Sequence, residues 1–244
     1  MGRYHYVFPK WSNLLLPTAI AAGAVVPLYV IFMVAYGFSP KTTDVGYMPT
    51  QPVPYSHALH AGTLGIDCRY CHNTVEVAAK AAIPPTQTCM NCHIQIHKDS
   101  VKIKPLLDSF TTGMPVLWTR VHDLPDYSYF NHAAHVTRGV SCVECHGRVD
   151  RMEVVTQEQP LSMGWCLECH RNPAKHLRDP ALVTTLGWGI GLNTEQKAEL
   201  AKQYNIDLSK DDAMLSDANK QAIGKYWREH NNLNPSQDCS TCHR

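Results

Sequence analysis

The chain has 244 residues, a formal net charge of +1 and only 18% charged residues, with no long basic or acidic run. That near-neutral balance gives no sign of a nucleic-acid-binding surface, and the length suits one or two domains. Five phenylalanines are few for a chain of this size, so side chains alone predict only a small apolar core.

An uncharged segment lies near the N-terminus. Residues 14–38 form a run of 25 residues without a charge, which exceeds the about 20 residues that a membrane-spanning helix requires. We predict a cytoplasmic tip and transmembrane anchor over residues 1–38 and a proline-rich linker over 39–54. Arg3 and Lys10 precede the segment and favour a cytoplasmic N-terminus. The alternative is a cleaved signal peptide, although the run is long for one and no clear cleavage site follows.

One repeated pattern, Cys-x-x-Cys-His, dominates the rest of the chain, and its five copies use all ten cysteines. This pattern is the attachment site of a c-type haem. On a helical turn, positions i, i+3 and i+4 share one face, so the sulfurs can form thioethers with the haem vinyl groups while the histidine ligates the iron. The predicted attachment residues are Cys68, Cys71, Cys89, Cys92, Cys142, Cys145, Cys166, Cys169, Cys239 and Cys242. The predicted proximal iron ligands are His72, His93, His146, His170 and His243.

Other uses of the cysteines fit the pattern less well. Cys-x-x-Cys pairs also form zinc sites, and ten cysteines could form five disulfides. Neither requires a histidine directly after the second cysteine, so we predict five haem c groups. Each haem then has about 40 residues, too few to bury five cofactors separately, and the haems must pack against one another. The predicted fold is mainly α-helical and irregular, with one N-terminal transmembrane helix and a haem-packed domain that has little regular secondary structure.

A repeat divides the haem domain. An aromatic residue and a His-x-x-His pair precede the first motif and again the third. The pairs are offset by 75 residues, the leading motifs by 74 and the following motifs by 77. We predict a first dihaem module over residues 55–110, a second dihaem module over 111–178, and a helical tail with the fifth haem site over 179–244.

The paired histidines have a chemical use, because a low-spin haem iron needs a second axial ligand. Residues i and i+3 of a helix point in similar directions, so each pair more plausibly ligates two neighbouring haems than one haem. For the fifth iron, His122 lies among aromatic and apolar residues and is favoured over His97, His176 and His230. Met163 and Met152 are the alternatives. The predicted distal ligands are His57, His60, His122, His132 and His135.

The tail carries two helical patterns. Residues 194–204 have a polar start and favour a short helix, and residues 210–229 contain a loose apolar stripe that favours a second. An Asn-Pro pair ends this second helix before the fifth motif.

Several stretches resemble a known family. The order of an aromatic residue, His-x-x-His and the haem motif looks like class III multihaem cytochromes c. Further stretches resemble the pentahaem cytochrome subunit of bacterial alternative complex III, namely residues 55–60, 65–68, 84–93, 118–126, 129–132 and 161–171. The resemblance covers nearly all of residues 1–176 and the terminal motif, whereas residues 180–238 are not distinctive. It implies a complex that oxidises membrane quinol and reduces a periplasmic cytochrome, copper protein or iron–sulfur protein.

The resemblance also implies partners: an iron–sulfur subunit related to molybdoenzymes and multi-spanning quinol-binding subunits. We therefore predict an electron-transfer subunit, not an enzyme on its own, in the bacterial cytoplasmic membrane with its haem domain on the periplasmic side. The alternative is a stand-alone membrane-anchored quinol dehydrogenase that feeds a periplasmic reductase, although such proteins carry four haems. A multihaem nitrite or hydroxylamine reductase would need an open iron, and a zinc scaffold would be colourless.

Overall fold

The computed structural model describes residues 8–37, 44–211 and 213–243. The chain divides into two compact units, Met1–Val45 and Gly46–Arg244. Phe38, the last residue of the predicted anchor, lies outside the described residues.

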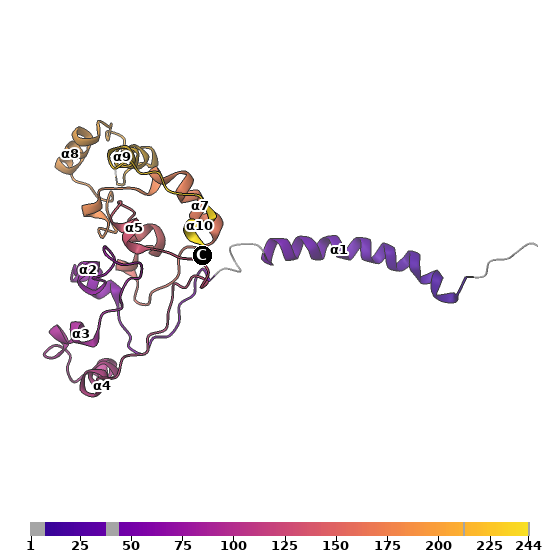
Figure 1. The fold of residues 1–244 in the computed structure, drawn as a ribbon, viewed down its shortest axis with the longest axis horizontal. Helices are drawn as coiled ribbons and strands as arrows, with labels where there is room; N and C mark the ends of the chain where they lie inside the picture. The colour runs from indigo at the N-terminus through magenta and orange to yellow at the C-terminus, as the bar shows by residue number, and fades with distance from the viewer. Residues whose placement is uncertain (1–7, 38–43, 212, 244) are drawn as a thin grey trace, which may run out of the picture. The chain divides into compact units, whose positions relative to one another are not determined.

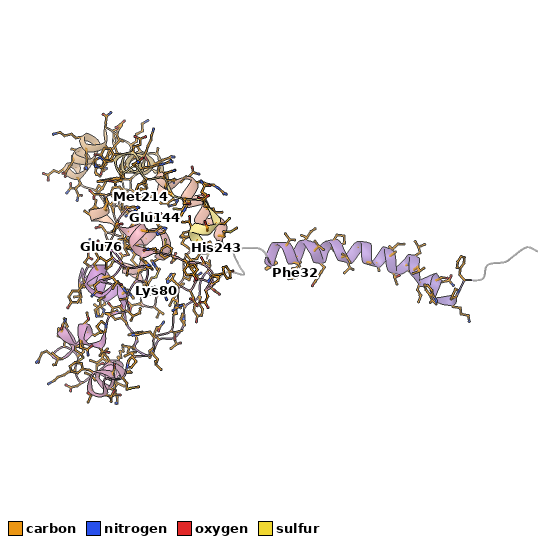
Figure 2. All side chains as sticks on the ribbon, in the orientation of Figure 1. Phe32, Glu76, Lys80, Glu144, Met214 and His243 are labelled. Atoms are coloured by element: carbon orange, nitrogen blue, oxygen red, sulfur yellow. The ribbon has the colours of Figure 1, made fainter. Side chains whose placement is uncertain are left out.

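The first unit is one apolar helix. A 3-10 turn, η1 (Lys10–Leu14), leads into α1 (Leu15–Gly37), which Figure 1 shows as one uninterrupted helix. Together they form a 28-residue segment, Lys10–Gly37, that is long and apolar enough to cross a bilayer. Figure 2 shows its side chains, Phe32 among them, projecting from the ribbon, and none of them is buried. An apolar surface of this kind is stable only against lipid or another apolar surface.

The second unit is built from short helices joined by long irregular segments (Figure 1). The residues that the structure describes form no strand, only three isolated bridges, at Ser128–His243, Val140–Leu177 and Ile190–Met214. Both units together confirm the predicted mainly helical and irregular fold. In chain order the helices are η3 (Ala58–Thr63), α2 (Cys68–Cys71), α3 (Thr86–His93), η4 (Val101–Ile103), α4 (Lys104–Thr112), α5 (His132–Val136), α6 (Cys142–His146), η5 (Val149–Arg151), α7 (Met163–Arg171), η6 (Pro173–His176), η7 (Pro180–Leu182), α8 (Thr194–Tyr204), α9 (Asp217–His230) and α10 (Cys239–Cys242).

All five Cys-x-x-Cys-His motifs lie on or at the end of a helical turn: α2, α3, α6, α7 and α10. Capping side chains fix where two of these helices begin. Asp67 accepts a hydrogen bond from the Arg69 backbone N–H at 2.8 Å, directly before the first motif. Ser162 caps α7 in the same way through the Trp165 N–H. A defined first turn places the two sulfurs of a motif on one face of its helix.

The two predicted modules are joined by a pair of equivalent hydrogen bonds. The Ala58 N–H donates to the Met152 carbonyl at 2.9 Å, and the Ala133 N–H donates to the Ala78 carbonyl at 3.1 Å. Given the offsets of 75 residues between the histidine pairs and 74 between the leading motifs, Ala58 corresponds to Ala133 and Met152 to Ala78. The helix that carries each histidine pair is therefore held by the other module. This reciprocity is what a duplication with approximate two-fold symmetry produces.

The tail binds both modules at equivalent positions. Asp67 and Ser141 each precede the leading cysteine of a module. The Ser141 hydroxyl donates to the Val183 carbonyl at 2.6 Å, and the Thr184 hydroxyl donates to the Asp67 carboxylate at 2.8 Å. Two adjacent tail residues thus fix the starts of α2 and α6 relative to each other.

The apolar core of the polypeptide is small. One cluster joins the two modules and the tail through Val75, Val136 and Val183, and a second, within the tail, holds Leu208, Leu215 and Ile223. Beside the motifs many apolar side chains are exposed on the polypeptide, including Tyr70 at 51%, Val77 at 80% and Ile94 at 52%. Buried side chains alone therefore do not account for the folding of the modules.

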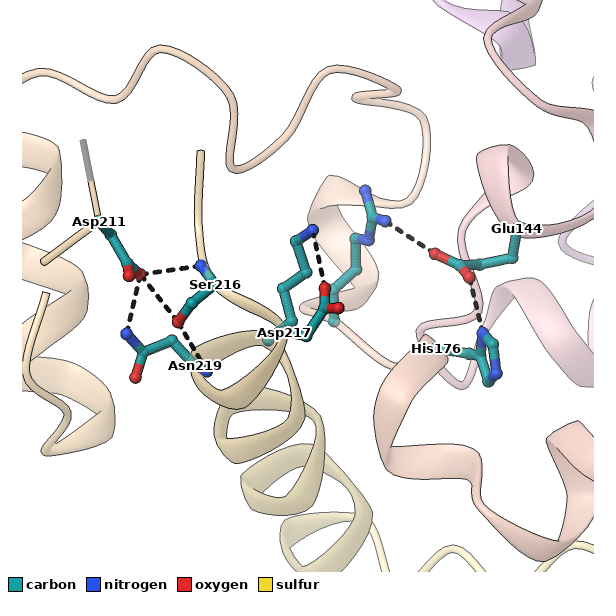
Figure 3. A network of polar contacts seen from close by, with 8 residues as sticks. Glu144, His176, Asp211, Ser216, Asp217 and Asn219 are labelled. Carbon is teal, nitrogen blue, oxygen red and sulfur yellow. Dashed lines mark hydrogen bonds and ion pairs between the residues drawn. The ribbon is translucent and has the colours of Figure 1, made fainter. Parts of the chain in front are cut away.

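The tail packs by its own polar and apolar contacts. Helix α8 begins as predicted, with a capping box between Asn193 and Gln196. Helix α9 begins at Asp217, later than the predicted 210, because Ser216 caps it. Figure 3 shows the buried Asp211 carboxylate accepting hydrogen bonds from Ser216 and Asn219 ahead of this helix.

Candidate haem-attachment sites

Each histidine pair lies against an aromatic ring. Tyr55 stacks on His60 with ring centroids 4.4 Å apart and meets His57 edge-on at 4.7 Å. In the second module Phe130 stacks on His135 at 4.6 Å and meets His132 edge-on at 4.8 Å. The two modules thus hold their pairs with the same ring geometry, in which one flat and one edge contact leave each imidazole few rotamers.

Three of these distal candidates face a proximal candidate across a similar gap. The ring centroids are 6.2 Å apart for His60 and His93, 6.4 Å for His132 and His146, and 6.1 Å for His135 and His170. A metal ion bonded at about 2 Å to one nitrogen of each of two opposed imidazoles holds their centroids about 6 Å apart. The gaps therefore fit a six-coordinate iron between each pair. Each His-x-x-His pair faces the two motifs of its own module.

The fourth distal candidate, His57, is half-buried beside His72. Burial, and then the charges of His72 and His60, lower the pKa of His57 to about 4. Burial and the neighbouring histidines likewise lower the pKa of His146 to about 3. Both imidazoles are therefore neutral near pH 7, the form in which histidine ligates a metal. The Nδ1 atom of His57 is buried and has no hydrogen-bond partner.

Hydrogen bonds determine which ring nitrogen carries the proton in most of the other candidate histidines. A carbonyl oxygen only accepts, so a histidine Nδ1 beside one carries the proton and leaves Nε2 free for a metal. Four proximal candidates have such a partner, with Nδ1 to carbonyl distances of 2.8 Å for His72 and Ala82, 3.0 Å for His93 and Ile96, 2.6 Å for His170 and Ser236, and 3.2 Å for His243 and Tyr127. Three distal candidates do too, His60 with Ser56, His132 with Ala79 and His135 with Asn131.

The fit to haem c therefore stands on three observations: motifs on helical turns, opposed imidazoles at iron-spanning separations, and Nδ1 atoms that are already hydrogen-bonded. Exposed apolar side chains beside the motifs add a surface that a macrocycle can cover. When bound, haem c supplies a reversible one-electron couple at its iron.

His122 lies at a different kind of position. Its Nε2 is 3.3 Å from Nδ1 of His146, which already faces His132. The structure thus brings His122 to the third motif, whereas the ring that lies beside His243 of the fifth motif is Tyr127, 5.8 Å away. The assignment of His122 as fifth distal ligand stays a prediction.

The two methionine alternatives for the fifth iron, and two histidines that the sequence did not favour, lie in varied surroundings. Met163 begins α7 with 66% of its surface exposed, and the Met152 carbonyl binds the helix of the first histidine pair. His97 is exposed, and His230 stacks on Tyr226. Both methionines stay predictions.

The motifs follow one another in a single series. The charge of Cys89 contributes to raising the pKa of Cys71, and that of Cys166 to raising the pKa of Cys145. The neighbouring Cys142 thiol, and then burial, raise the pKa of Cys68. The charge of Cys242 contributes to raising the pKa of Cys166. These contributions link the second motif to the first, the first to the third, the third to the fourth and the fourth to the fifth. All ten cysteines are among the described residues; Cys92 and Cys239, in the two end motifs, are exposed, and the others are half-buried.

An acidic residue within the third motif organises a polar network that the sequence did not single out. Glu144 accepts a hydrogen bond from His176 at 2.7 Å and one from Arg178 at 3.1 Å (Figure 3). The buried Arg178 guanidinium also lies over the Trp188 ring, 5.1 Å from its centroid. No local pattern marks an arginine 34 residues downstream as the partner of a motif residue.

These features define a multihaem c-type cytochrome. The chain is similar to the multihaem cytochrome c subunit of menaquinone reductase from Nitratidesulfovibrio vulgaris, with 30% identity over 177 aligned positions; the match covers 62% of this chain and 83% of that protein. The chain belongs to this family of multihaem cytochrome c subunits. No protein-family model matches it.

Proposed function

We propose that the chain is a membrane-anchored pentahaem cytochrome c that relays electrons inside a quinol-oxidising complex of the alternative complex III type. The observation that carries this proposal is the single series of five motifs whose two end members are exposed. A series with accessible ends gives one place for electrons to enter and another for them to leave. The proposed carrier at the exit is a soluble periplasmic protein.

In this proposal the residues of the chain anchor and orient five haem groups. The ten cysteines form the thioether bonds, and the motif histidines ligate the irons from one side. His57, His60, His132 and His135 ligate four irons from the other. The aromatic rings behind these pairs and the carbonyls at their Nδ1 atoms hold the imidazoles in the ligating orientation.

The chain is proposed not to oxidise quinol by itself. A quinol site requires a pocket at membrane depth and groups that accept protons. The apolar helix has neither carboxylate nor histidine over residues 14–38, and a single helix does not enclose a pocket. The proposed partners are multi-spanning quinol-binding subunits and an iron–sulfur subunit, as the resemblance implies. The proposed location is the bacterial cytoplasmic membrane, with the haem domain on its periplasmic side.

A second candidate reverses the direction of electron flow. The related chain is named as a subunit of a menaquinone reductase. In the reverse direction, a periplasmic donor would reduce the exposed end of the series and the complex would deliver electrons to menaquinone. Both directions require the same arrangement of motifs.

Two measurements test the proposal. The intact mass of the mature chain should exceed the 27.3 kDa polypeptide by about five haems; four or fewer would overturn the pentahaem assignment. The purified complex, given menaquinol, should reduce all haems and then a periplasmic carrier. Reduction of menaquinone by a pre-reduced carrier, with no reaction from menaquinol, would favour the second candidate. Haem reduction by this chain alone in lipid, at the rate of the complex, would favour the stand-alone quinol dehydrogenase.

A further inference from the structure

His146 differs from the other four motif histidines in what its Nδ1 atom meets. Those four have a backbone carbonyl as partner. At His146 the partner is the side chain of His122, with Nδ1 and Nε2 3.3 Å apart and ring centroids 4.3 Å apart at 76°. We propose that His122 is a positioning residue that accepts the hydrogen bond of His146 and lowers the reduction potential of the haem on the third motif. This inference rests on the proposed attachment of haem there.

The direction of the hydrogen bond follows from ligation. If Nε2 of His146 ligates iron, its Nδ1 carries the proton and must donate. Nε2 of His122 therefore accepts, and the proton of His122 is on its own Nδ1. An imidazole nitrogen is a stronger base than a peptide carbonyl, so it draws the proton of His146 further and makes the ligand more anionic. A more basic ligand stabilises the ferric state and lowers the potential.

The segment around His122 is held from both sides. Gln51 forms two hydrogen bonds with the backbone of Thr119, its amide donating to the carbonyl at 2.8 Å and its carbonyl accepting from the N–H at 2.9 Å. Beyond it, Arg120 and Asp123 form an ion pair at 2.6 Å across the turn that contains His122. The imidazole is therefore presented to His146 by a fixed backbone.

The arrangement is specific to the second module. In the first module His72, which corresponds to His146, donates to the Ala82 carbonyl. The residue 75 positions before His122 is Tyr47, which lies in the predicted linker, so no histidine occupies the equivalent position. Two otherwise equivalent motifs thus differ in the acceptor of one proton, in the middle of the series of five.

Three variants of the full-length, haem-loaded protein test the proposal. His122→Phe keeps a ring but removes the acceptor, His122→Asn keeps a side-chain acceptor, and His122→Ala removes both. His97→Ala is the matched control, because His97 is an exposed histidine. Each protein is analysed for haem content by mass, for spin state by electronic and electron paramagnetic resonance spectra, and for midpoint potentials by spectroelectrochemical titration.

We expect five low-spin haems in every variant and one potential raised in His122→Phe and His122→Ala. The expected rise corresponds to a change of about tenfold in the ferric-to-ferrous ratio, which equals about 59 mV for a one-electron couple. His122→Asn should recover part of the shift, and His97→Ala should show none. If His122→Ala does not mature, the comparison of the Phe and Asn variants decides.

Two results would overturn the inference. A haem that turns high-spin in all three variants would show that His122 is a distal ligand, as the sequence predicts. Unchanged potentials with five low-spin haems would show that His122 has no influence on the third motif, and would leave the pentahaem relay standing. A wild-type protein without haem on the third motif would instead refute the proposed function.

Discussion

The two predicted dihaem modules have the same histidine and aromatic geometry but differ in the contacts around it. In both, an aromatic ring stacks on the second histidine of the pair, and the Nδ1 of that histidine donates to a carbonyl four residues earlier. In the second module His132 also donates to the Ala79 carbonyl of the first module, whereas the equivalent Nδ1 of His57 is unpartnered. The geometry expected at the iron is therefore retained, and the surrounding contacts have diverged.

This difference shows which contacts a duplicated module has to preserve. The hydrogen bond from His132 to Ala79 has no counterpart at His57, so this bond is not one that both modules preserve. Divergent contacts, such as His122 with His146, Glu144 with Arg178 and His132 with Ala79, each involve a residue of the second module. Equivalent positions in the two modules therefore provide matched pairs of variants.

The largest effect is expected from removing an equivalent predicted distal ligand in each module. His60→Ala and His135→Ala should each retain five attached haems and convert one of them to high-spin, because each histidine faces one proximal partner at about 6 Å. Electron paramagnetic resonance and haem mass measure this directly. A variant that stays entirely low-spin would show that the removed histidine is not an axial ligand.

A close approach between modules should make one glycine essential. A Cβ atom on Gly62 of η3 would overlap the Asp150 carbonyl, whereas the equivalent position on the other histidine-pair segment is occupied by Thr137. We expect Gly62→Thr to lower the free energy of unfolding by about 1–3 kcal/mol, because the backbone must shift.

Thr137→Gly is the matched control. This variant should lower the free energy of unfolding by about 0.5–1 kcal/mol, because glycine makes the unfolded chain more flexible. Denaturant unfolding of the haem-loaded proteins measures both. An equal loss of unfolding free energy in the two variants would mean that Gly62 of η3 is not closely packed against the Asp150 carbonyl.

The next effect concerns Asp67 and Ser141, which precede equivalent helices; the Asp67 side chain caps α2, whereas the Ser141 side chain bonds to the tail. Hydrogen bonds from Arg69, and then those from Thr184, lower the pKa of Asp67 to about 2 against burial. A depressed folded-state pKa stabilises the fold above the unfolded value of about 3.9, and this contribution is lost as pH falls towards 2. Asp67→Asn should therefore cost about 1 kcal/mol at pH 7 and remove part of the acid sensitivity between about pH 4 and 2.

Ser141→Ala provides the contrast. The buried hydroxyl donates to the Val183 carbonyl and does not titrate, so its loss should cost about 1 kcal/mol at every pH. Unfolding curves between pH 2 and 7 separate the two variants. Parallel curves for Asp67→Asn and wild type would contradict the role of the carboxylate.

The smallest effect is expected from Tyr55→Phe. Phe130 occupies the equivalent place and makes the same flat and edge contacts without a hydroxyl. The free energy of unfolding should change by about 0.5 kcal/mol or less, and all haems should stay low-spin. A larger change would reveal a specific role for the Tyr55 hydroxyl.

Local patterns predicted the local features of this chain. The apolar run predicted α1 nearly to its ends, and the polar start at 194 predicted α8, because length, charge and capping act within a few residues. The start of α9 was misplaced, since the Asp211 and Ser216 contacts that delay it depend on the tail's own packing.

The contacts between modules could not be predicted in the same way. The bond from Ala58 to Met152 joins residues far apart in the sequence, and its donor and acceptor are backbone atoms that leave no mark in the residue types. The motif spacing indicated helical turns and candidate ligands. The spacing could not show that His122 lies against His146, because the sequence does not distinguish a histidine that binds a metal from one that bonds to another imidazole.

The hydrogen bonds that join each histidine-pair helix to the other module also have a consequence for biosynthesis. The chain is made from its N-terminus, so the first histidine pair exists before η5 and Met152, to which its helix binds. Until then η3 lacks the backbone partner that it has in the complete fold. Helix η3 is the first helix of the haem domain to be made, yet it can reach its final position only after the Met152 segment of the second module has been synthesised.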